Sequence, residues 1–93
     1  MAHKILTART PMAPGRFLHS RFLRPAGLTQ TDAACRLGLS RRRLNEIIQG
    51  HRGITPDTAL RLSLLFGLPP RFWLDLQGDW DLAQARRKLQ HAA

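Results

Sequence analysis

Three consecutive arginines, Arg41 to Arg43, stand between a serine, Ser40, and an apolar residue, Leu44. Serine is a preferred N-cap, so this spacing predicts a helix whose first turn consists of arginines. The positive end of the helix dipole disfavours a cation there by about 0.3–1 kcal/mol. We therefore expect an external anion to offset the cost of placing three arginines at this helix end.

The outer surface of the same helix continues with Asn45, Glu46 and Gln49, whose side chains are amides and a carboxylate. In the major groove of DNA, arginine binds guanine O6 and N7, and an amide can bind adenine. This pattern predicts a helix that inserts into the major groove of double-stranded DNA. The alternative is a solvated charged face, although such faces normally mix Lys and Glu at i,i+4 spacing.

The remaining chemistry-bearing residues have no spacing typical of a catalytic or metal site. The four histidines are scattered through the chain: His3, His19, His51 and His91. Asp79 and Asp81 are two apart on a predicted helix, so their carboxylates point to different sides. Cys35 is the single cysteine, which excludes an intramolecular disulfide, and no histidine neighbours it in sequence. We expect no enzyme, no cofactor and no metal site.

Composition supports a small basic domain that meets a polyanion on one side. The chain has 93 residues, enough for one domain, with 15 Lys and Arg against 6 Asp and Glu. Residues 1–43 hold nine of the basic residues and one acid, a formal charge of +8, and the rest is nearly neutral. A basic surface kept for solubility is the alternative. The short apolar runs predict neither a transmembrane helix nor a signal peptide, and hence a cytoplasmic, nucleoid-associated protein.

Caps, prolines and glycines divide the chain into five helices. The predicted helices run from Pro14 to the Pro25-Ala26-Gly27 turn, from the Thr29 cap to Gly38, from the Ser40 cap to Gly50, from the Thr55 cap to Gly67, and from Pro69 and Pro70 to about residue 90. Val, Ile and Thr nowhere alternate with period two, so no strand is expected. Residues 1–13 are predicted to be a flexible N-terminal arm and residues 14–93 one all-α domain.

The segment QTDAACRLGLSRRRLNEIIQG resembles the helix-turn-helix of lambda-repressor and Cro-type DNA-binding domains. Gln30 is followed at fixed offsets by Ala34, Gly38, Leu44 and Ile47. The small Ala34 allows the two helices to approach closely, and Gly38 makes the turn between them. Leu44 and Ile47 then hold the second helix on the first. The resemblance implies a five-helix lambda-repressor-like fold.

Within that group, residues 14–83 are most similar to HigA/VapI-type antitoxins. The more specific matches are the segments RLNEIIQGHRGITPDTALRLS and LFGLPPRFWLDLQGDWDL, which general helix-turn-helix proteins do not need. Two details depart from the family pattern. Arg42 and Arg43 make the recognition turn unusually basic, so an operator sequence cannot be carried over, and Pro69 replaces a small hydroxyl cap.

The resemblance implies which residues contact DNA. Gln30 and Ser40 would bind phosphates through their side chains and the nearby helix N-terminal amides. Arg41, Arg42 and Glu46 would face base edges. All five lie in the two helices of the helix-turn-helix or at their starts.

Four more residues are implied as contacts to the DNA backbone. Arg43 and Asn45 lie on the recognition helix close to the base-reading positions. His51 and Arg52 lie in the loop after that helix, where this fold commonly touches the flanking phosphate. For His51, an exposed loop histidine without a role is the alternative.

The fifth predicted helix carries two apolar stripes on nearly opposite sides. The first consists of Phe72, Trp73, Leu76, Trp80 and Ala83; the second consists of Leu74, Gly78, Leu82, Ala85 and Leu89. A helix on the surface of a monomer needs only one stripe, so we expect the second to meet another molecule. Leu64 and Leu65 also lie outside the inward face of the fourth helix. The predicted dimer interface is Leu64, Leu74, Leu82, Ala85 and Leu89. The alternative is that the last turns fray in solvent.

These observations favour a dimeric, sequence-specific repressor that binds a palindromic double-stranded DNA operator with recognition helices about 34 Å apart. The resemblance adds that it would be the antitoxin of a type II toxin–antitoxin pair, which represses its own operon and neutralises a small basic ribonuclease toxin. One alternative is a stand-alone or phage-like repressor without a toxin. Another is an adaptor whose basic half binds RNA or an acidic protein. No membrane partner is expected.

Overall fold

The computed structural model describes residues 11–92, which form helices joined by short turns. In chain order these are α2 (Pro14–Leu18), η1 (His19–Leu23), α3 (Gln30–Leu37), α4 (Arg41–Ile48), α5 (Pro56–Phe66) and α6 (Pro70–Ala92). The all-α prediction is confirmed, and α6 is slightly longer than the sequence suggested. Residues 1–10 of the predicted arm lie outside the described residues. Within the described part of the chain, no helix is long and apolar enough to cross a membrane.

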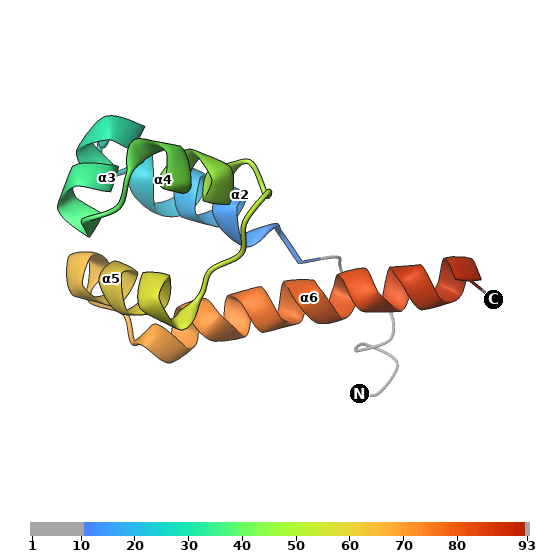
Figure 1. The fold of residues 1–93 in the computed structure, drawn as a ribbon. Coiled ribbons are helices and arrows are strands. Elements are labelled where there is room, and N and C mark those ends of the chain that lie inside the picture. The colour runs from blue at the N-terminus through green and yellow to red at the C-terminus, as the bar shows by residue number, and fades with distance from the viewer. Residues whose placement is uncertain (1–10, 93) are drawn as a thin grey trace.

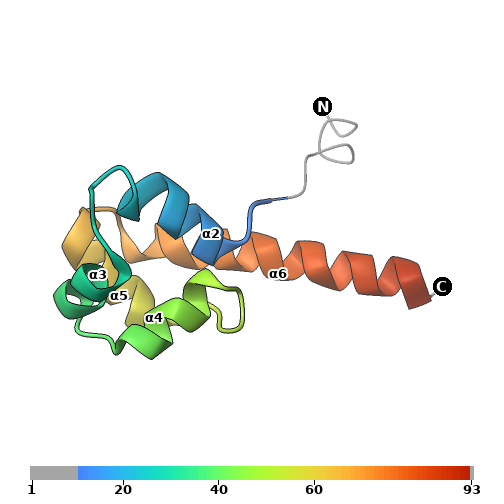
Figure 2. The ribbon, with the colours of Figure 1, turned by 90° about the horizontal axis from the view of Figure 1, so that it is seen from above.

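The long helix α6 is the axis on which the other helices are assembled. Its N-terminal half packs against α5 and α2, with α3 and α4 forming the far side of the body (Figure 1). Its C-terminal half projects beyond the other helices, as the view from above also shows (Figure 2). The described residues therefore form a compact helical body from which the C-terminal half of α6 projects.

The predicted caps fix the ends of the central helices. The hydroxyl groups of Thr29, Ser40 and Thr55 accept hydrogen bonds from backbone N–H groups in the first turns of α3, α4 and α5, at 3.1, 3.1 and 3.3 Å. Gly38 ends α3 with φ 71°, a left-handed conformation that residues with a Cβ rarely adopt. These local signals place the turn between α3 and α4 where the sequence predicted it.

The first predicted helix contains a feature that its sequence did not reveal. After Leu18 the α-helix widens into a π-helical turn, in which the N–H of Arg24 donates to the carbonyl oxygen of His19 at 3.0 Å. A wider turn changes which side chains share a face. As a result Leu18 and Leu23, five residues apart, are both completely buried.

The core lies where the first four helices meet the start of α6. Its buried apolar side chains come from every described helix and from two connecting loops: Leu18, Leu23, Ala33, Ala34, Leu37, Leu39, Leu44, Ile47, Ile54, Ala59, Leu62 and Trp73. Trp73 is completely buried and contacts three phenylalanine rings, with centroid distances of 4.9 Å to Phe22, 5.1 Å to Phe72 and 6.4 Å to Phe66. Close aromatic pairs of this kind add to the free energy of burial.

Two leucines assigned to the outer surface from the sequence pack partly inward. Leu65 and Leu74 are half-buried and lie against the core, because α5 and α6 contact each other beside them. The prediction for Leu65 was wrong, and Leu74 is shared between the core and the outer face of α6. Leu64 is 88% exposed.

Candidate nucleic-acid interface

The helices α3 and α4 form the helix-turn-helix, held together by the residues that the sequence singled out. Leu44 and Ile47 of α4 are buried, as are Ala33 and Ala34 of α3. With these side chains directed inward, α4 turns its opposite face to solvent. That face carries Arg41, Arg42, Asn45 and Gln49, all exposed.

The start of α3 and the middle of α4 are linked by a side-chain amide pair. The Nδ2 group of Asn45 donates a hydrogen bond to Oε1 of Gln30 at 3.0 Å. Both side chains keep further donor and acceptor capacity, since an amide has two N–H groups and two lone pairs. The pair therefore fixes the orientation of Asn45 on the exposed face while leaving hydrogen-bonding groups for a ligand.

Glu46 is the centre of a small ionic network on the same face. Its carboxylate accepts from Arg52 Nε at 3.1 Å and Nη2 at 3.0 Å, and lies 3.5 Å from Arg42 Nε. The hydrogen bond from Arg52 lowers the pKa of Glu46 below its usual value, with further lowering by the charges of Arg52 and Arg42. The network connects α4 to the loop that follows it.

Arg43 is turned away from the exposed face of α4. Its Nη2 donates to Asp57 Oδ2 at 3.4 Å and to Thr58 Oγ1 at 3.2 Å, both on α5. Asp57 also accepts from Arg61 Nε at 3.0 Å, and this hydrogen bond is the main reason that the pKa of Asp57 is lowered. In this structure Arg43 therefore joins α4 to α5 instead of pointing toward a DNA backbone.

The expectation that three arginines need an external anion is corrected by these contacts. Arg42 and Arg43 have carboxylate partners within the chain, Glu46 and Asp57 respectively. Over residues 11–92, Arg41 has no ion pair or side-chain hydrogen bond, and it is exposed. Arg41 is thus the recognition-helix arginine whose guanidinium group is most available to a ligand.

Two residues that the sequence analysis left without a role hold the backbone on either side of α4 in place. Gln77 of α6 accepts a hydrogen bond from the backbone N–H of Ile54 at 2.8 Å, and so holds the loop after α4. Arg61 of α5 donates to the carbonyl oxygens of Leu37 and Gly38 at 3.0 and 3.3 Å, at the end of α3. Both partners are backbone groups far away in sequence, so no local pattern could have indicated them.

The comparisons with known proteins bear on this geometry. A family model described as helix-turn-helix matches residues 21–73. Virulence-associated protein I of Dichelobacter nodosus is 43% identical over 77 residues, which cover 83% of this chain and 71% of that protein. Antitoxin HigA-1 of Vibrio cholerae is 33% identical over 87 residues, covering 94% and 82%. The chain belongs to the HigA/VapI-type antitoxin group of helix-turn-helix proteins.

Solved structures of the group share the fold over most of their length. An addiction module antidote protein of the HigA family from Coxiella burnetii superposes with a TM-score of 0.83 at 34% identity, covering 90% of this chain and 91% of that one. The Pseudomonas aeruginosa antitoxin HigA, solved with the higBA promoter, gives a TM-score of 0.79 at 31% identity, covering 89% and 95%. The relative solved with DNA thus has the same helical body.

The remaining predicted site residues lie on two separate parts of the molecule. Ser40 caps α4, and His51 is exposed in the loop that also carries Arg52. The candidate self-association residues Leu82, Ala85 and Leu89 are exposed on the projecting part of α6, away from the helix-turn-helix. Within residues 11–92, no group of three His, Cys, Asp or Glu side chains is placed to hold a metal ion.

Proposed function

We propose that this protein is a sequence-specific DNA-binding repressor that contacts the major groove through α4. The observation that carries this proposal is the exposed face of α4, where Arg41 has no partner among the described residues and Asn45 is oriented by Gln30. Arginine and amide groups on the exposed face of a recognition helix match the hydrogen-bonding pattern of base edges. In this proposal Gln30, Ser40, His51 and Arg52 provide contacts to phosphates beside it.

The proposed DNA is a palindromic operator bound by a homodimer. Leu82 and Leu89 are 58% and 72% exposed, and with Ala85 they form an apolar surface on α6 that a monomer leaves in water. We place these three residues at the centre of the dimer contact, with Leu74 and the exposed Leu64 at its margin. A two-fold dimer presents two recognition helices to two half-sites.

The proposed biological role is that of an antitoxin that represses its own operon. The support is the family itself, whose relatives are named as antitoxins and, in one case, solved with a promoter. The proposed partner is a small basic toxin, and the protein would act by binding, with no catalytic activity of its own.

The antitoxin role is tested by co-expression with the neighbouring gene, which is proposed to encode the toxin. Co-expression is expected to restore the growth that this gene inhibits and to give a complex that survives gel filtration. A harmless neighbouring gene would instead favour a stand-alone repressor.

The DNA-binding proposal is tested by titration with two duplexes of equal length. A duplex that contains the palindrome upstream of the gene is expected to bind about 10³-fold or more tightly than a scrambled duplex. Equal affinities for the two duplexes would contradict sequence-specific binding. Tighter binding of single-stranded RNA of the same length would indicate an RNA adaptor.

A further inference from the structure

One side chain of α6, that of Gln77, binds the loop that carries two of the proposed phosphate contacts. The loop runs from α4 to α5 and passes beside the middle of α6 (Figure 1). There Oε1 of Gln77 accepts a hydrogen bond from the N–H of Ile54 at 2.8 Å, and Nε2 of Gln77 donates to Oδ1 of Asp81 at 2.9 Å. Asp81 lies one helical turn further along α6, so it orients the amide with its oxygen toward the loop.

The backbone of the loop lies directly against the Gln77 amide at Gly53. A Cβ at Gly53 would lie 3.2 Å from Cδ and Nε2 of Gln77, and 3.3 Å from Oε1. These separations are shorter than ordinary van der Waals contact, so a side chain at position 53 would displace the amide or the loop. The absence of a side chain at Gly53 therefore allows Gln77 to reach the N–H of Ile54.

The space beneath the loop is only partly filled. A cavity of about 420 Å³ is lined by the loop, by the start of α2 and by Gln77 and Trp80 of α6. The loop is attached to α4 where the N–H of His51 donates to the carbonyl oxygen of Glu46 at 2.9 Å, and it enters the core at Ile54, which is 4% exposed. Because a cavity offers the loop few packing contacts, its position depends strongly on its hydrogen bonds.

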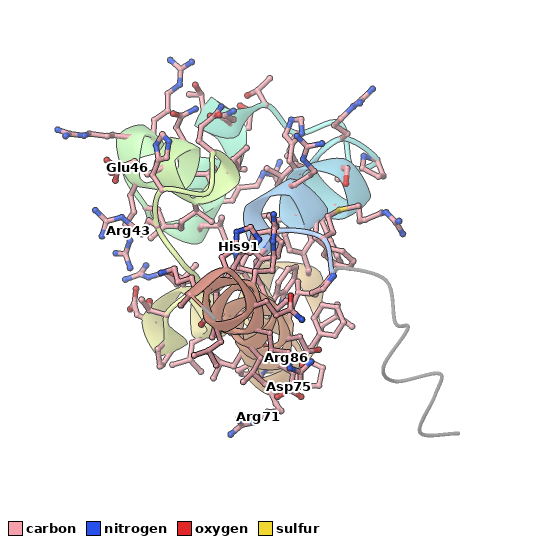
Figure 3. The ribbon with its side chains drawn as sticks, turned by 90° about the vertical axis from the view of Figure 1, so that its right-hand side faces the viewer. Arg43, Glu46, Arg71, Asp75, Arg86 and His91 are labelled. Carbon is pink, nitrogen blue, oxygen red and sulfur yellow. The ribbon has the colours of Figure 1, made fainter. Side chains whose placement is uncertain are left out.

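The loop position determines where the guanidinium group of Arg52 lies. Arg52 donates to Glu46 through Nε and Nη2 at 3.1 and 3.0 Å, beside the exposed face of α4. Arg52 and Ile54 are two residues apart, so their Cα atoms are separated by at most about 7 Å, and a shift of one backbone position moves the other. In the view along α6, Glu46 lies to one side of this helix (Figure 3). Gln77 is half-buried and is connected to that face through the loop.

We infer that Gln77 is a positioning residue for DNA binding, which holds the N–H of Ile54 and thereby keeps Arg52 where it can contact a phosphate. This inference rests on the proposed DNA-binding function and adds a residue of α6 to those that set the affinity. An arginine on a loop that is already held in place loses less conformational freedom when it binds a phosphate. The hydrogen bond from Ile54 therefore contributes to affinity although Gln77 itself does not touch the DNA.

The first test removes the hydrogen bonds of Gln77 and keeps a side chain of similar size. Gln77→Leu is expected to bind a duplex with one half of the upstream palindrome about tenfold more weakly at low salt. The slope of log affinity against log salt should become shallower by about 0.9, as the loss of one phosphate contact requires. A half-site duplex is used so that dimerisation does not affect the result. Fluorescence anisotropy at several salt concentrations measures both quantities.

Gln84→Leu is the matched control for this test. Gln84 is also a half-buried glutamine of α6, two helical turns beyond Gln77 and away from the loop. Its replacement should leave the half-site affinity and the salt slope unchanged. A Gln77→Leu protein that is folded by circular dichroism and has the wild-type salt slope would overturn the inference, because a purely structural role lowers the melting temperature without changing the number of phosphate contacts.

A conservative variant separates the hydrogen bond from the packing of this side chain. In Gln77→Glu a carboxylate oxygen can still accept from the N–H of Ile54. The salt slope should therefore remain that of the wild type, although the added negative charge lowers the affinity itself. A slope as shallow as that expected for Gln77→Leu would contradict the hydrogen bond as the cause. If Gln77→Leu does not fold, Gly53→Ala gives the same test from the loop side, with the slope again expected to become shallower.

A double-mutant cycle tests whether Gln77 acts through Arg52. Arg52→Ala should make the slope shallower by about 0.9, because it removes the phosphate contact directly. Adding Gln77→Leu to Arg52→Ala should then change neither the slope nor the half-site affinity further. Additive losses would contradict the proposed route.

The same titrations distinguish failure of this inference from failure of the proposed function. If the wild-type protein binds the half-site and a scrambled duplex equally, sequence-specific DNA binding fails. If the wild type prefers the half-site and Arg52→Ala makes the slope shallower, but Gln77→Leu and Gly53→Ala keep the wild-type slope, only the positioning role of Gln77 is overturned.

Discussion

Two carboxylates decide which arginines near α4 remain available to DNA. Glu46 binds Arg42 and Arg52, and Asp57 binds Arg43 and Arg61. These ion pairs are solvent-accessible, so each contributes little to stability. Their larger effect is on position, because a guanidinium group that is held by a carboxylate must exchange this partner for a phosphate or base. Among the described residues Arg41 has no such partner to exchange.

Arg41→Ala is expected to weaken operator binding by about 1–3 kcal/mol and binding to scrambled DNA by much less, because Arg41 is proposed to read a base. Arg36→Ala is the matched control, since Arg36 is an exposed arginine in the last turn of α3. It removes the same charge away from the recognition helix. Fluorescence anisotropy titrations measure both. Equal losses on the two DNAs for Arg41→Ala would show that this residue contacts only phosphate.

The Glu46 and Asp57 ion pairs predict a loss of stability in acid. The pKa of each carboxyl is lowered in the folded state, mainly by hydrogen bonds from Arg52 and Arg61, from ordinary values of 4.5 and 3.8. A lowered pKa stabilises the folded protein above the ordinary value, and this stabilisation disappears as the pH falls through the folded-state pKa. Glu46→Gln should therefore melt at a lower temperature than the wild type at neutral pH, and this difference should disappear as the pH falls through the folded-state pKa of Glu46. A pH-independent difference would mean that Glu46 acts through packing.

For single residues, the sequence predicts helix caps better than it predicts side-chain contacts between helices. Thr29, Ser40 and Thr55 bond to backbone groups three residues away, so their roles follow from local spacing. Arg43 bonds to residues 14 and 15 positions away, and only the tertiary fold, in which α5 contacts α3 and α6, brings them together. The sequence therefore did not show that Arg42 is held by Glu46 and Arg43 by Asp57, whereas Arg41 has no such partner among the described residues.

Among the helices, α2 and α4 approach each other closely at Gly15. A Cβ at Gly15 would overlap the carbonyl oxygen of Ile47, so the two backbones approach directly. This contact was not predicted, because a glycine after Pro14 resembles an ordinary helix start.

Gly15→Ala is expected to destabilise the protein by about 2 kcal/mol or more, because backbone atoms of α4 must move to admit the methyl group. The same substitution at Gly78 is the control, since its site is open and alanine favours the helix. Thermal melts of the two variants should shift in opposite directions. A Gly15→Ala variant as stable as the wild type would show that α2 and α4 can separate without cost.

Over the whole molecule, the DNA-binding face and the self-association face lie on different elements. The described helix-turn-helix is at one end of the body, and the exposed leucines of α6 are on the projecting helix (Figures 1 and 3). The two apolar stripes of α6 were readable from the sequence because helical periodicity is local. The body ends before Leu82, which the sequence did not show, so the described residues leave Leu82, Ala85 and Leu89 exposed.

Leu82→Asp is expected to convert the dimer to a monomer without unfolding it. Covering a leucine side chain fully contributes about 1.5–3 kcal/mol, and symmetry counts each substitution twice. Leu82 is 58% exposed in the protomer, so the helical body does not depend on it. Affinity for the full palindrome should fall with dimerisation, because a monomer offers one recognition helix, while half-site affinity stays the same. Leu76→Asp is the contrasting variant, since Leu76 packs on the core and its replacement should unfold the domain. Analytical ultracentrifugation and DNA titration decide the matter: a Leu82→Asp protein that remains dimeric and prefers the palindrome would place the dimer contact elsewhere on the molecule.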